Sequence, residues 1–224
     1  MTILEAMHTR HSVRAYQDRP IEPAALERLR AELTRCNEEG GLHLQLVTGE
    51  PDAFAGLMAH YGKFTGVRNY IALAGKKGKG LDEALGWYGE RLVLLAQQLG
   101  LNTCWVGLTF SRSQVKKRVE LGKGEALRLV VALGYGADAG TEHESRPLRE
   151  CCRADGAMPE WFGHGMKAAM LAPTALNRQR FRFTLLPDGS VRAESLGGAY
   201  SKVDLGIVKY HFAQLAGEEN FSWA

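Results

Sequence analysis

The sequence predicts an α+β fold, and three segments carry this prediction. Apolar residues recur every three or four positions across residues 82–99, and Gly100 follows them as a typical helix-ending glycine. Residues 127–133 form an apolar, β-rich run that is typical of an interior strand. Residues 181–185 and 191–195 flank Pro187-Asp188-Gly189, which predicts a β-hairpin. Mixed helices and strands in this order indicate an α+β domain.

The part of the chain before residue 82 is expected to mix helices and strands. Pro20-Ile21-Glu22-Pro23 opens a helix over residues 24–35, and Gly40-Gly41 closes this region. Apolar residues alternate over 42–47, as in a strand with one buried face. The other elements expected here are a first helix at 3–8, a short amphipathic helix at 52–61, a buried strand at 70–74 and a mobile basic loop at 75–80.

The remaining elements follow from the same periodicities. The expected order after the helix at 82–99 is an apolar loop at 103–110, a short helix at 113–119, the interior strand at 127–133, a long loop-like stretch, a helix at 158–171, the hairpin, and a last helix at 203–216.

Composition excludes several classes of protein. A chain of 224 residues with 45% hydrophobic and 24% charged residues can bury a large core, which argues against disorder. A net charge of +3 is too small to indicate a nucleic-acid partner, and no apolar run is long enough for a membrane span. The first residues include an early acid, Glu5, and no apolar stretch, so we expect no secretory signal. The four cysteines show no metal or disulfide spacing, so we expect a reduced cytoplasmic protein without structural metal.

The two parts of the chain resemble each other. Residues 42–47 can be aligned with residues 180–185, which places 34–41 opposite 172–179. A helix followed by Gly, Asn and Trp occurs twice, once ending at Gly100 and once at Gly217. Two amphipathic helices with glycine ends can look alike by chance. The alternative is a fused pair of related halves, about 1–150 and 151–224, that pack together as the subunits of a two-fold dimer do.

Two polar segments are candidates for ligand binding. Arg10-His11-Ser12-Val13-Arg14 places two guanidiniums and a hydroxyl close together, and such groups bind phosphate and carbonyl oxygens. A solvated basic turn would have the same composition. Ala172-Pro173-Thr174-Ala175-Leu176-Asn177-Arg178-Gln179 offers side-chain donors and acceptors between a helix and a strand, although a plain helix-to-strand connection would look similar.

Other segments give weaker signals. The segment at 99–107 is more apolar than a surface loop, and its backbone groups need partners. Cys104 has no base beside it, which favours a packing role over a nucleophile. The segment at 144–148 supplies one more arginine, Arg146. The glycines at 75–80 and 134–140 fit neither a phosphate loop nor a dinucleotide fingerprint, and the histidines lack metal-ligand spacing.

Taken together, these segments resemble the nitroreductase family of flavoproteins. The resemblance rests on the Arg10–Arg14 motif, on 100–105, on Leu133-Gly134-Tyr135, on Arg146-Pro147-Leu148 and on 172–179. In ordinary members the Ala-Pro-Ser-like segment comes early, whereas here it comes last, as in a subgroup of short nitroreductases. The ending Val203–Phe212 is also similar to that subgroup.

The resemblance implies a single nitroreductase-like domain over 1–224, with FMN as cofactor and NAD(P)H as co-substrate. In ordinary members FMN lies at a dimer interface, so one chain with two related halves implies an intrachain pseudo-dimer, a monomer with one site, although a homodimer is possible. No side chain is expected to act as a catalytic acid or base. By motif, Arg10 and Arg146 would bind the FMN phosphate with Ser12 nearby, and Arg14 would face the pyrimidine edge. The other cofactor-binding residues implied are His11, Trp105, Val106, Gly107, Thr174, Asn177 and Gln179.

The implied function is an FMN-dependent oxidoreductase that transfers hydride to a nitroaromatic, a quinone or a similar small acceptor. Two alternatives stay open. One is a related flavin reaction, such as reductive dehalogenation or flavin fragmentation. The other is a non-catalytic flavin-binding or redox-sensing protein.

Overall fold

The structure is a computed structural model that describes residues 1–154 and 156–224. The chain divides into two compact units built from interleaved segments. Unit 1 consists of Met1–His8, Asp82–Glu90 and His143–Ala224. Unit 2 consists of Thr9–Leu81 and Arg91–Glu142. The predicted α+β class is confirmed, because each unit combines helices with its own sheet.

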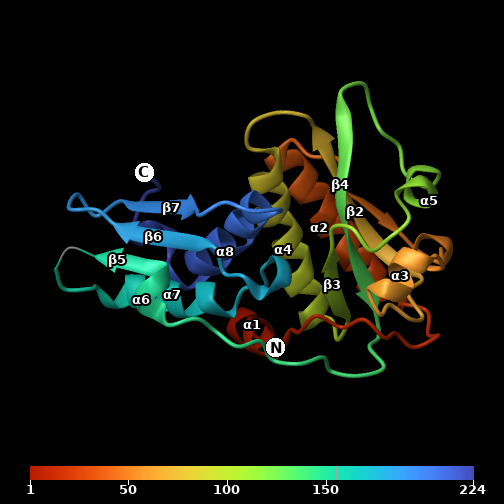
Figure 1. Cartoon of the computed structure of the whole chain (residues 1–224), viewed down its shortest axis with the longest axis horizontal. Helices are drawn as coiled ribbons and strands as arrows, with labels where there is room; N and C mark the ends of the chain where they lie inside the picture. The colour runs from red at the N-terminus through yellow and green to blue at the C-terminus, as the bar shows by residue number, and fades with distance from the viewer. Residues whose placement is uncertain (155) are drawn as a thin grey trace. The chain divides into compact units, whose positions relative to one another are not determined.

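Unit 2 contains a four-stranded antiparallel sheet in the order β1-β2-β4-β3 (Figure 1). Its strands are β1 (Gln45–Val47), β2 (Asn69–Lys76), β3 (Asn102–Val106) and β4 (Glu125–Gly134). The apolar run at 127–133 is an interior strand, as predicted, because β4 pairs with β2 on one side and with β3 on the other. The strand predicted at 70–74 is confirmed as the buried part of β2.

The core of unit 2 lies against this sheet. Apolar side chains of the strands pack with Val13 and Tyr16 from the N-terminal segment and with aromatic residues from the 50–70 region. Phe54 contacts Phe64 edge-to-face, with ring centroids 5.1 Å apart, and lies 6.2 Å from the ring of Tyr70. These contacts connect the N-terminal segment to the centre of the sheet.

The helix predicted at 24–35 is longer, and the strand after it is shorter. The helix α2 (Pro23–Gly40) ends where Gly41 adopts a φ of 59° and donates its N–H to the Asn37 carbonyl. The side chain of Asn37 then bonds both the N–H and the carbonyl of Leu44. The regular ladder begins at Gln45, although the predicted start at residue 42 still pairs with β2, through an isolated bridge between Leu42 and Gly75 and a bond from the His43 N–H to the Ala74 carbonyl.

Four further predictions for unit 2 need correction. The helix predicted at 52–61 is two short pieces, the 3-10 turn η1 (Asp52–Phe54) and α3 (Leu57–Tyr61), separated at Gly56. The loop predicted at 103–110 begins as strand β3, because β4 supplies partners for its backbone groups. The helix predicted at 113–119 is the shorter α5 (Arg112–Lys116). The basic loop predicted at 75–80 is shorter as well, since β2 extends to Lys76.

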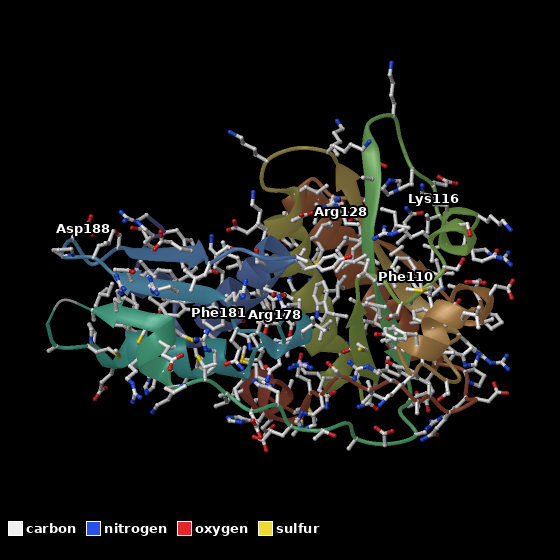
Figure 2. The ribbon with its side chains drawn as sticks, viewed as in Figure 1. Phe110, Lys116, Arg128, Arg178, Phe181 and Asp188 are labelled. Carbon is white, nitrogen blue, oxygen red and sulfur yellow. The ribbon has the colours of Figure 1, made fainter. Side chains whose placement is uncertain are left out.

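Unit 1 contains the predicted hairpin. Strands β6 (Phe181–Leu185) and β7 (Val191–Ser195) pair antiparallel. Asp188 at the hairpin tip accepts hydrogen bonds from the N–H and hydroxyl of Ser190, and these bonds lower the pKa of Asp188 (Figure 2).

The prediction missed α6 (Leu148–Cys151) and β5 (Cys152–Ala154) in the stretch expected to be loop-like. The sequence pattern could not predict β5, because its three residues form a strand only through parallel pairing with β6.

Two helices form the other layer of unit 1. The predicted helices are confirmed as α7 (Glu160–Leu171) and α8 (Ser201–Ala216), which pack on each other and lie beside the β6–β7 hairpin in Figure 1. Phe212 of α8 lies edge-to-face with Phe162 of α7, with ring centroids 5.4 Å apart, and stacks on Phe183 of β6 at 4.8 Å. A short turn, η3 (Glu218–Asn220), follows α8, and Trp223 then pairs with Val191 at the edge of β7.

The remaining helices are α1 (Ile3–Thr9) and α4 (Leu81–Gln98), and both were predicted. Gly100 has a φ of 76°, as expected for the residue that ends a helix. The four cysteines, all within the described residues, are free and buried. Among residues 1–154 and 156–224, no helix is both long and apolar enough to span a membrane.

The N-terminal half of α4 and the start of α8, both in unit 1, approach each other through glycines. A Cβ at Gly206 would lie 1.9 Å from the carbonyl oxygen of Glu83, and one at Gly86 would lie 2.0 Å from that of Val203. Both obstacles are backbone atoms that cannot move aside independently. The two helices can therefore pack in this way only if both positions lack a side chain.

We expect Gly206→Ala to lower the free energy of unfolding by about 3 kcal/mol or more, because the added methyl group forces the helices apart. Gly163→Ala in α7 is the matched control. Its added Cβ would meet only the Met158 sulfur, at 3.9 Å, so the better helix propensity of alanine should leave stability unchanged or higher by up to about 1 kcal/mol. Urea unfolding of both variants tests this, and equal stabilities would contradict it.

Candidate functional site

The Arg10–Arg14 segment extends the sheet of unit 2 beyond its edge strand. Ser12 pairs with Thr103 of β3 in a parallel bridge, and the N–H of Val13 donates to the Thr103 carbonyl at 3.1 Å. Val13 is buried in the core, so backbone pairing and side-chain packing both fix the segment. Successive residues of an extended chain point to opposite sides. Pairing with β3 therefore sets the direction of the candidate ligand-binding side chains.

The two arginines of this segment lie in different environments. Arg10 is 5% exposed, whereas Arg14 is exposed and donates to the carbonyl of Ser12 at 3.3 Å. The guanidinium of Arg14 lies 6.0 Å from the ring centroid of Phe64, within reach of a cation–π interaction. Unit 2 thus holds one cation inside its structure and presents another at its surface.

Cys104 lies beneath this segment in β3. Burial raises the pKa of its thiol, while Arg14, a hydrogen bond with Ser12 and Arg10 oppose the shift. The thiol therefore stays protonated at neutral pH, where a nucleophilic cysteine would need to be a thiolate. This agrees with the predicted packing role of Cys104.

The residues predicted at 105–107 form the end of β3 and the turn after it. Trp105 and Val106 pair with Val131 and Val130 of β4. The Gly107 carbonyl accepts a hydrogen bond from Arg112, whose guanidinium also bonds the carbonyls of residues 127 and 128. Figure 2 shows Phe110 in this part of unit 2, and the Arg112 guanidinium lies 5.1 Å from its ring centroid. Arg112 therefore fixes the turn that follows β3.

An exposed apolar surface lies next to Phe64. Leu57 and Tyr61 of α3 are 88% and 83% exposed, and Met58 and Leu108 are also exposed. A Cβ at Gly62 would lie 2.6 Å from the Thr109 hydroxyl, so the end of α3 contacts the turn that carries Leu108. Thr65, next to Phe64, donates its N–H to the carbonyl of Arg14 at 3.0 Å. We call Leu57, Met58, Tyr61 and Leu108 the α3 surface.

In unit 1, Gln179 connects the predicted 172–179 segment to residues 144–146. The Gln179 side chain accepts the N–H of Arg146 at 2.9 Å and donates to the Glu144 carbonyl and to Asn177 Oδ1, both at 2.8 Å. Asn177 also donates to the Glu144 carbonyl at 2.8 Å, and Gln179 N–H donates to the Thr174 hydroxyl at 3.0 Å. Gln179 is 1% exposed, so its amide group is fully used inside the unit.

The backbone of this segment, which we call the 174–179 turn, is strained. Leu176, Asn177 and Gln179 have φ values of 54°, 52° and 47°, a left-handed conformation that costs residues other than glycine about 1–3 kcal/mol each. Such strain persists only where surrounding interactions impose it, and it is concentrated at ligand-binding sites. The hydrogen bonds of Gln179 supply the constraint. The turn is therefore a candidate ligand-binding element on grounds independent of its sequence motif.

Asp204 of α8 is a second support of the turn, and sequence analysis missed it. Its Oδ1 accepts the N–H of Ala175 at 3.0 Å, and its carboxyl is 6% exposed. An acidic residue inside the apolar run Val203–Val208 is the signal that could have identified it.

Arg146 has a local partner. Its guanidinium forms a 2.5 Å ion pair with Glu150, one helical turn further along, and both side chains are partly exposed. An anion bound by Arg146 would share the guanidinium with this carboxylate. Exposed pairs of this kind contribute only about 0–1 kcal/mol, so the pair is no strong barrier to a ligand.

The predicted site residues therefore form two sets, each organised within one unit. Unit 2 brings together Arg10, His11, Ser12 and Arg14 with β3 and the turn after it, and unit 1 brings together Arg146, Thr174, Asn177 and Gln179. Binding of a cofactor by these residues stays a prediction. Among the described residues, no cluster of three or more His, Cys, Asp or Glu side chains could hold a metal ion.

We expect Gln179→Leu to lower the free energy of unfolding by about 1–3 kcal/mol, because it removes the buried amide that accepts the N–H of Arg146 and donates to the Glu144 carbonyl and to Asn177. The exposed neighbour Arg178 provides the control, and Arg178→Ala should change stability by less than about 0.5 kcal/mol. Thermal or urea unfolding measures both variants. A Gln179→Leu protein as stable as the control would show that the amide network does not hold the turn.

Comparison with solved structures identifies the fold. A protein from Thermotoga maritima, described as a "putative nitroreductase", superposes with a TM-score of 0.63 at 21% identity, covering 98% of this chain and 85% of that one. An FMN complex of a protein from Desulfovibrio desulfuricans gives a TM-score of 0.54 at 18% identity, covering 67% and 94%. A Parabacteroides distasonis protein, described as an NADH dehydrogenase/NAD(P)H nitroreductase, gives 0.51 at 21% identity, covering 66% and 95%.

The sequence itself carries the family assignment. No curated protein matches the chain significantly. The family model described as "Putative TM nitroreductase" matches residues 2–216, which is nearly the whole chain. The structural similarity agrees with this match, and the resemblance inferred from the motifs is confirmed at the level of the family. The chain therefore belongs to this nitroreductase family.

Proposed function

We propose that the protein is an FMN-dependent oxidoreductase that transfers hydride from NAD(P)H to a small apolar acceptor such as a nitroaromatic or a quinone. The observation that carries the proposal is the Arg10–Arg14 segment, whose backbone pairs with β3 at Ser12, in a chain that matches a nitroreductase family over residues 2–216. The FMN bound to the Desulfovibrio desulfuricans relative supports the choice of cofactor.

The residues of both sets fit an anionic, planar cofactor with many carbonyl groups. Arg10 and Arg146 would bind the phosphate with Ser12 nearby, since guanidinium groups match phosphate oxygens. Arg14 would face the pyrimidine edge. Thr174 and Asn177 would contact the ribityl or ring side together with backbone groups of the turn, and Gln179 would keep the turn in shape. His11 and the backbone of Trp105, Val106 and Gly107 would line the remaining ring edge.

FMN supplies hydride chemistry at its ring when it is bound. The chain's own contribution is electrostatic and positional. A fixed guanidinium at Arg14 favours negative charge on the pyrimidine side, and the strand pairing of Ser12 and Val13 keeps that charge in place without reorganisation. No proton needs to move to or from a side chain, so we assign no catalytic acid or base.

We propose that one chain supplies both sets of residues, so that an intrachain pseudo-dimer holds one FMN. Two features support the idea. Glycines with a φ of 76° follow both α4 and α8, at Gly100 and Gly217, and each unit contains its own sheet. The segment at 34–41, which is aligned with 172–179, lies in the ordinary helix α2 up to Gly40. A homodimer in which two chains complete the site is the alternative.

The α3 surface supports an apolar acceptor. It is joined to the Arg14 segment through Phe64 and Thr65, so an aromatic acceptor could lie on apolar side chains while the guanidinium interacts with its electron-rich oxygens. The short helix α3 buries Ala59 and leaves its large apolar residues outside, which is the opposite of ordinary core packing.

The first test is the cofactor and its reduction. The purified protein should carry flavin absorbance, and the released group should have the mass of FMN. NADH or NADPH should bleach the absorbance under anaerobic conditions, and an aromatic acceptor should restore it. Flavin that is bound but not reduced would instead support a non-catalytic binding or redox-sensing role. Retained FMN with turnover of only halogenated acceptors, or with destruction of the flavin, would indicate one of the other flavin reactions.

We expect Arg14→Ala to weaken FMN binding about tenfold and to lower the reduction potential of the bound flavin, because the favourable charge is lost. Arg14→Lys should recover part of the potential, since it keeps the charge but loses the planar fork. Arg30→Ala, which removes an exposed charge from α2, is the control and should bind FMN normally. Unchanged affinity and potential in Arg14→Ala would refute the assigned role.

We expect Leu57→Ser combined with Tyr61→Ser to raise the KM for an aromatic acceptor about tenfold, because each loses apolar contact area. FMN affinity, stability and the KM for NAD(P)H should change little, since these side chains are largely exposed in the free protein. Steady-state kinetics with Leu196→Ser, another exposed leucine, as the control would measure the effect. An unchanged KM for the acceptor would show that the α3 surface does not bind it.

A further inference from the structure

A buried acid on α8 accepts a hydrogen bond from the backbone of the 174–179 turn. Asp204 lies in the first turns of α8, and its Oδ1 accepts the N–H of Ala175 at 3.0 Å. The carboxyl is 6% exposed. Ala175 lies directly on the carboxyl, so displacement of the turn would give water access to it.

The turn therefore has two anchors of different chemistry. Gln179 fixes its end through a neutral amide whose hydrogen bonds do not change with pH. Asp204 fixes its beginning through a group that can ionise. Between the anchors, Leu176 and Asn177 have left-handed φ values that would relax if either anchor were released.

Burial is the main influence on this carboxyl. The pKa of Asp204 is raised to about 7 because burial disfavours the charged form, and the Ala175 N–H opposes part of this shift. Acidic and basic side chains lie on every element of unit 1 that packs against α8, and Lys202 lies on α8 itself. They are Asp82, Glu83 and Glu90 of α4, Glu160, His164 and Lys167 of α7, Arg182 of β6, Arg192 and Glu194 of β7, and Glu218 and Glu219 of η3. On α8 itself, Lys209 bonds Glu83 at 2.6 Å and His211 bonds Glu90 at 2.9 Å. Among the described residues, none of these side chains shifts the titration of Asp204.

Linkage between protonation and conformation decides how pH changes the stability of the turn. A buried acid favours the closed, water-excluded state while it is protonated. This advantage is lost as the pH rises through the pKa that the acid has in the closed state. In the protonated form the carboxyl can still accept the Ala175 N–H. In the ionised form the carboxylate gains hydration if the turn moves away.

We propose that Asp204 is a positioning residue that holds the 174–179 turn closed when protonated and loosens it when ionised, so that FMN release becomes faster as the pH rises. This inference rests on the proposed function, because it takes the turn to be part of the FMN site. It adds a pH-dependent control of cofactor retention to that function.

The test compares FMN dissociation rates of the holoprotein at pH 6.0 and pH 8.5. We expect the rate for the unmodified protein to rise about tenfold over this range relative to Asp204→Asn, whose amide oxygen keeps the hydrogen bond but cannot ionise. The FMN phosphate titrates alike in both proteins, so the ratio of the rates isolates Asp204. Asp188→Asn, the same change at the hairpin tip, should behave like the unmodified protein.

Hydrogen exchange of the Ala175 amide in the cofactor-free protein is the second measurement. After correction for the intrinsic pH dependence of exchange, the opening constant should rise about tenfold between pH 6.0 and pH 8.5 in the unmodified protein. Equal pH profiles for the unmodified protein and Asp204→Asn, in dissociation or in exchange, would overturn the inference while leaving FMN binding intact. A protein that binds no FMN but shows the exchange effect would overturn the proposed function and the link to cofactor retention, while confirming the pH-dependent turn. If Asp204→Asn does not fold, a flat exchange profile in the unmodified protein would overturn the inference.

Discussion

The buried amide of Gln179 holds the 174–179 turn in a conformation that its residues would not adopt alone. Three residues other than glycine have left-handed φ values within four positions, two of them inside the short 3-10 turn η2 (Ala175–Asn177). One side chain connects this turn to Glu144 and Arg146, so residues separated in sequence become one rigid element. The proposed site in unit 1 depends on this connection, because Arg146, Thr174 and Asn177 are positioned through it.

Unit 2 fixes its candidate residues by a different mechanism. The Arg10–Arg14 segment pairs with the edge strand β3 and inserts Val13 into the core, so sheet geometry alone sets its direction. A strand edge gives a regular alternation of side chains, which suits a row of charged groups. A strained turn instead exposes backbone groups in irregular directions, which suits the varied oxygen and nitrogen atoms of a cofactor such as FMN.

Much of the fold was predictable because the signals were local. Apolar spacing and Gly100 define α4, and Pro187-Asp188-Gly189 defines the β6–β7 hairpin. The errors arose where a distant partner decides the structure. β3 is a strand because β4 lies beside it, and β5 is a strand because it pairs with β6.

The candidate site shows the same division. The motifs identified the arginines and the amide-rich segment. They could not show that the hydrogen-bonding groups of Gln179 are occupied within the protein, since two of its partners are backbone groups 33 and 35 positions away. Asp204 was missed for a related reason. Its importance comes from burial and from the Ala175 amide, neither of which a local pattern reveals.

In our proposal, a single chain supplies both sets of residues to one FMN. Native mass spectrometry of the flavin-saturated protein would test this, because it reports the number of chains and of cofactors in the same ion. We expect one chain with one FMN. Two FMN molecules per chain, or FMN bound only in a dimer, would contradict the proposal.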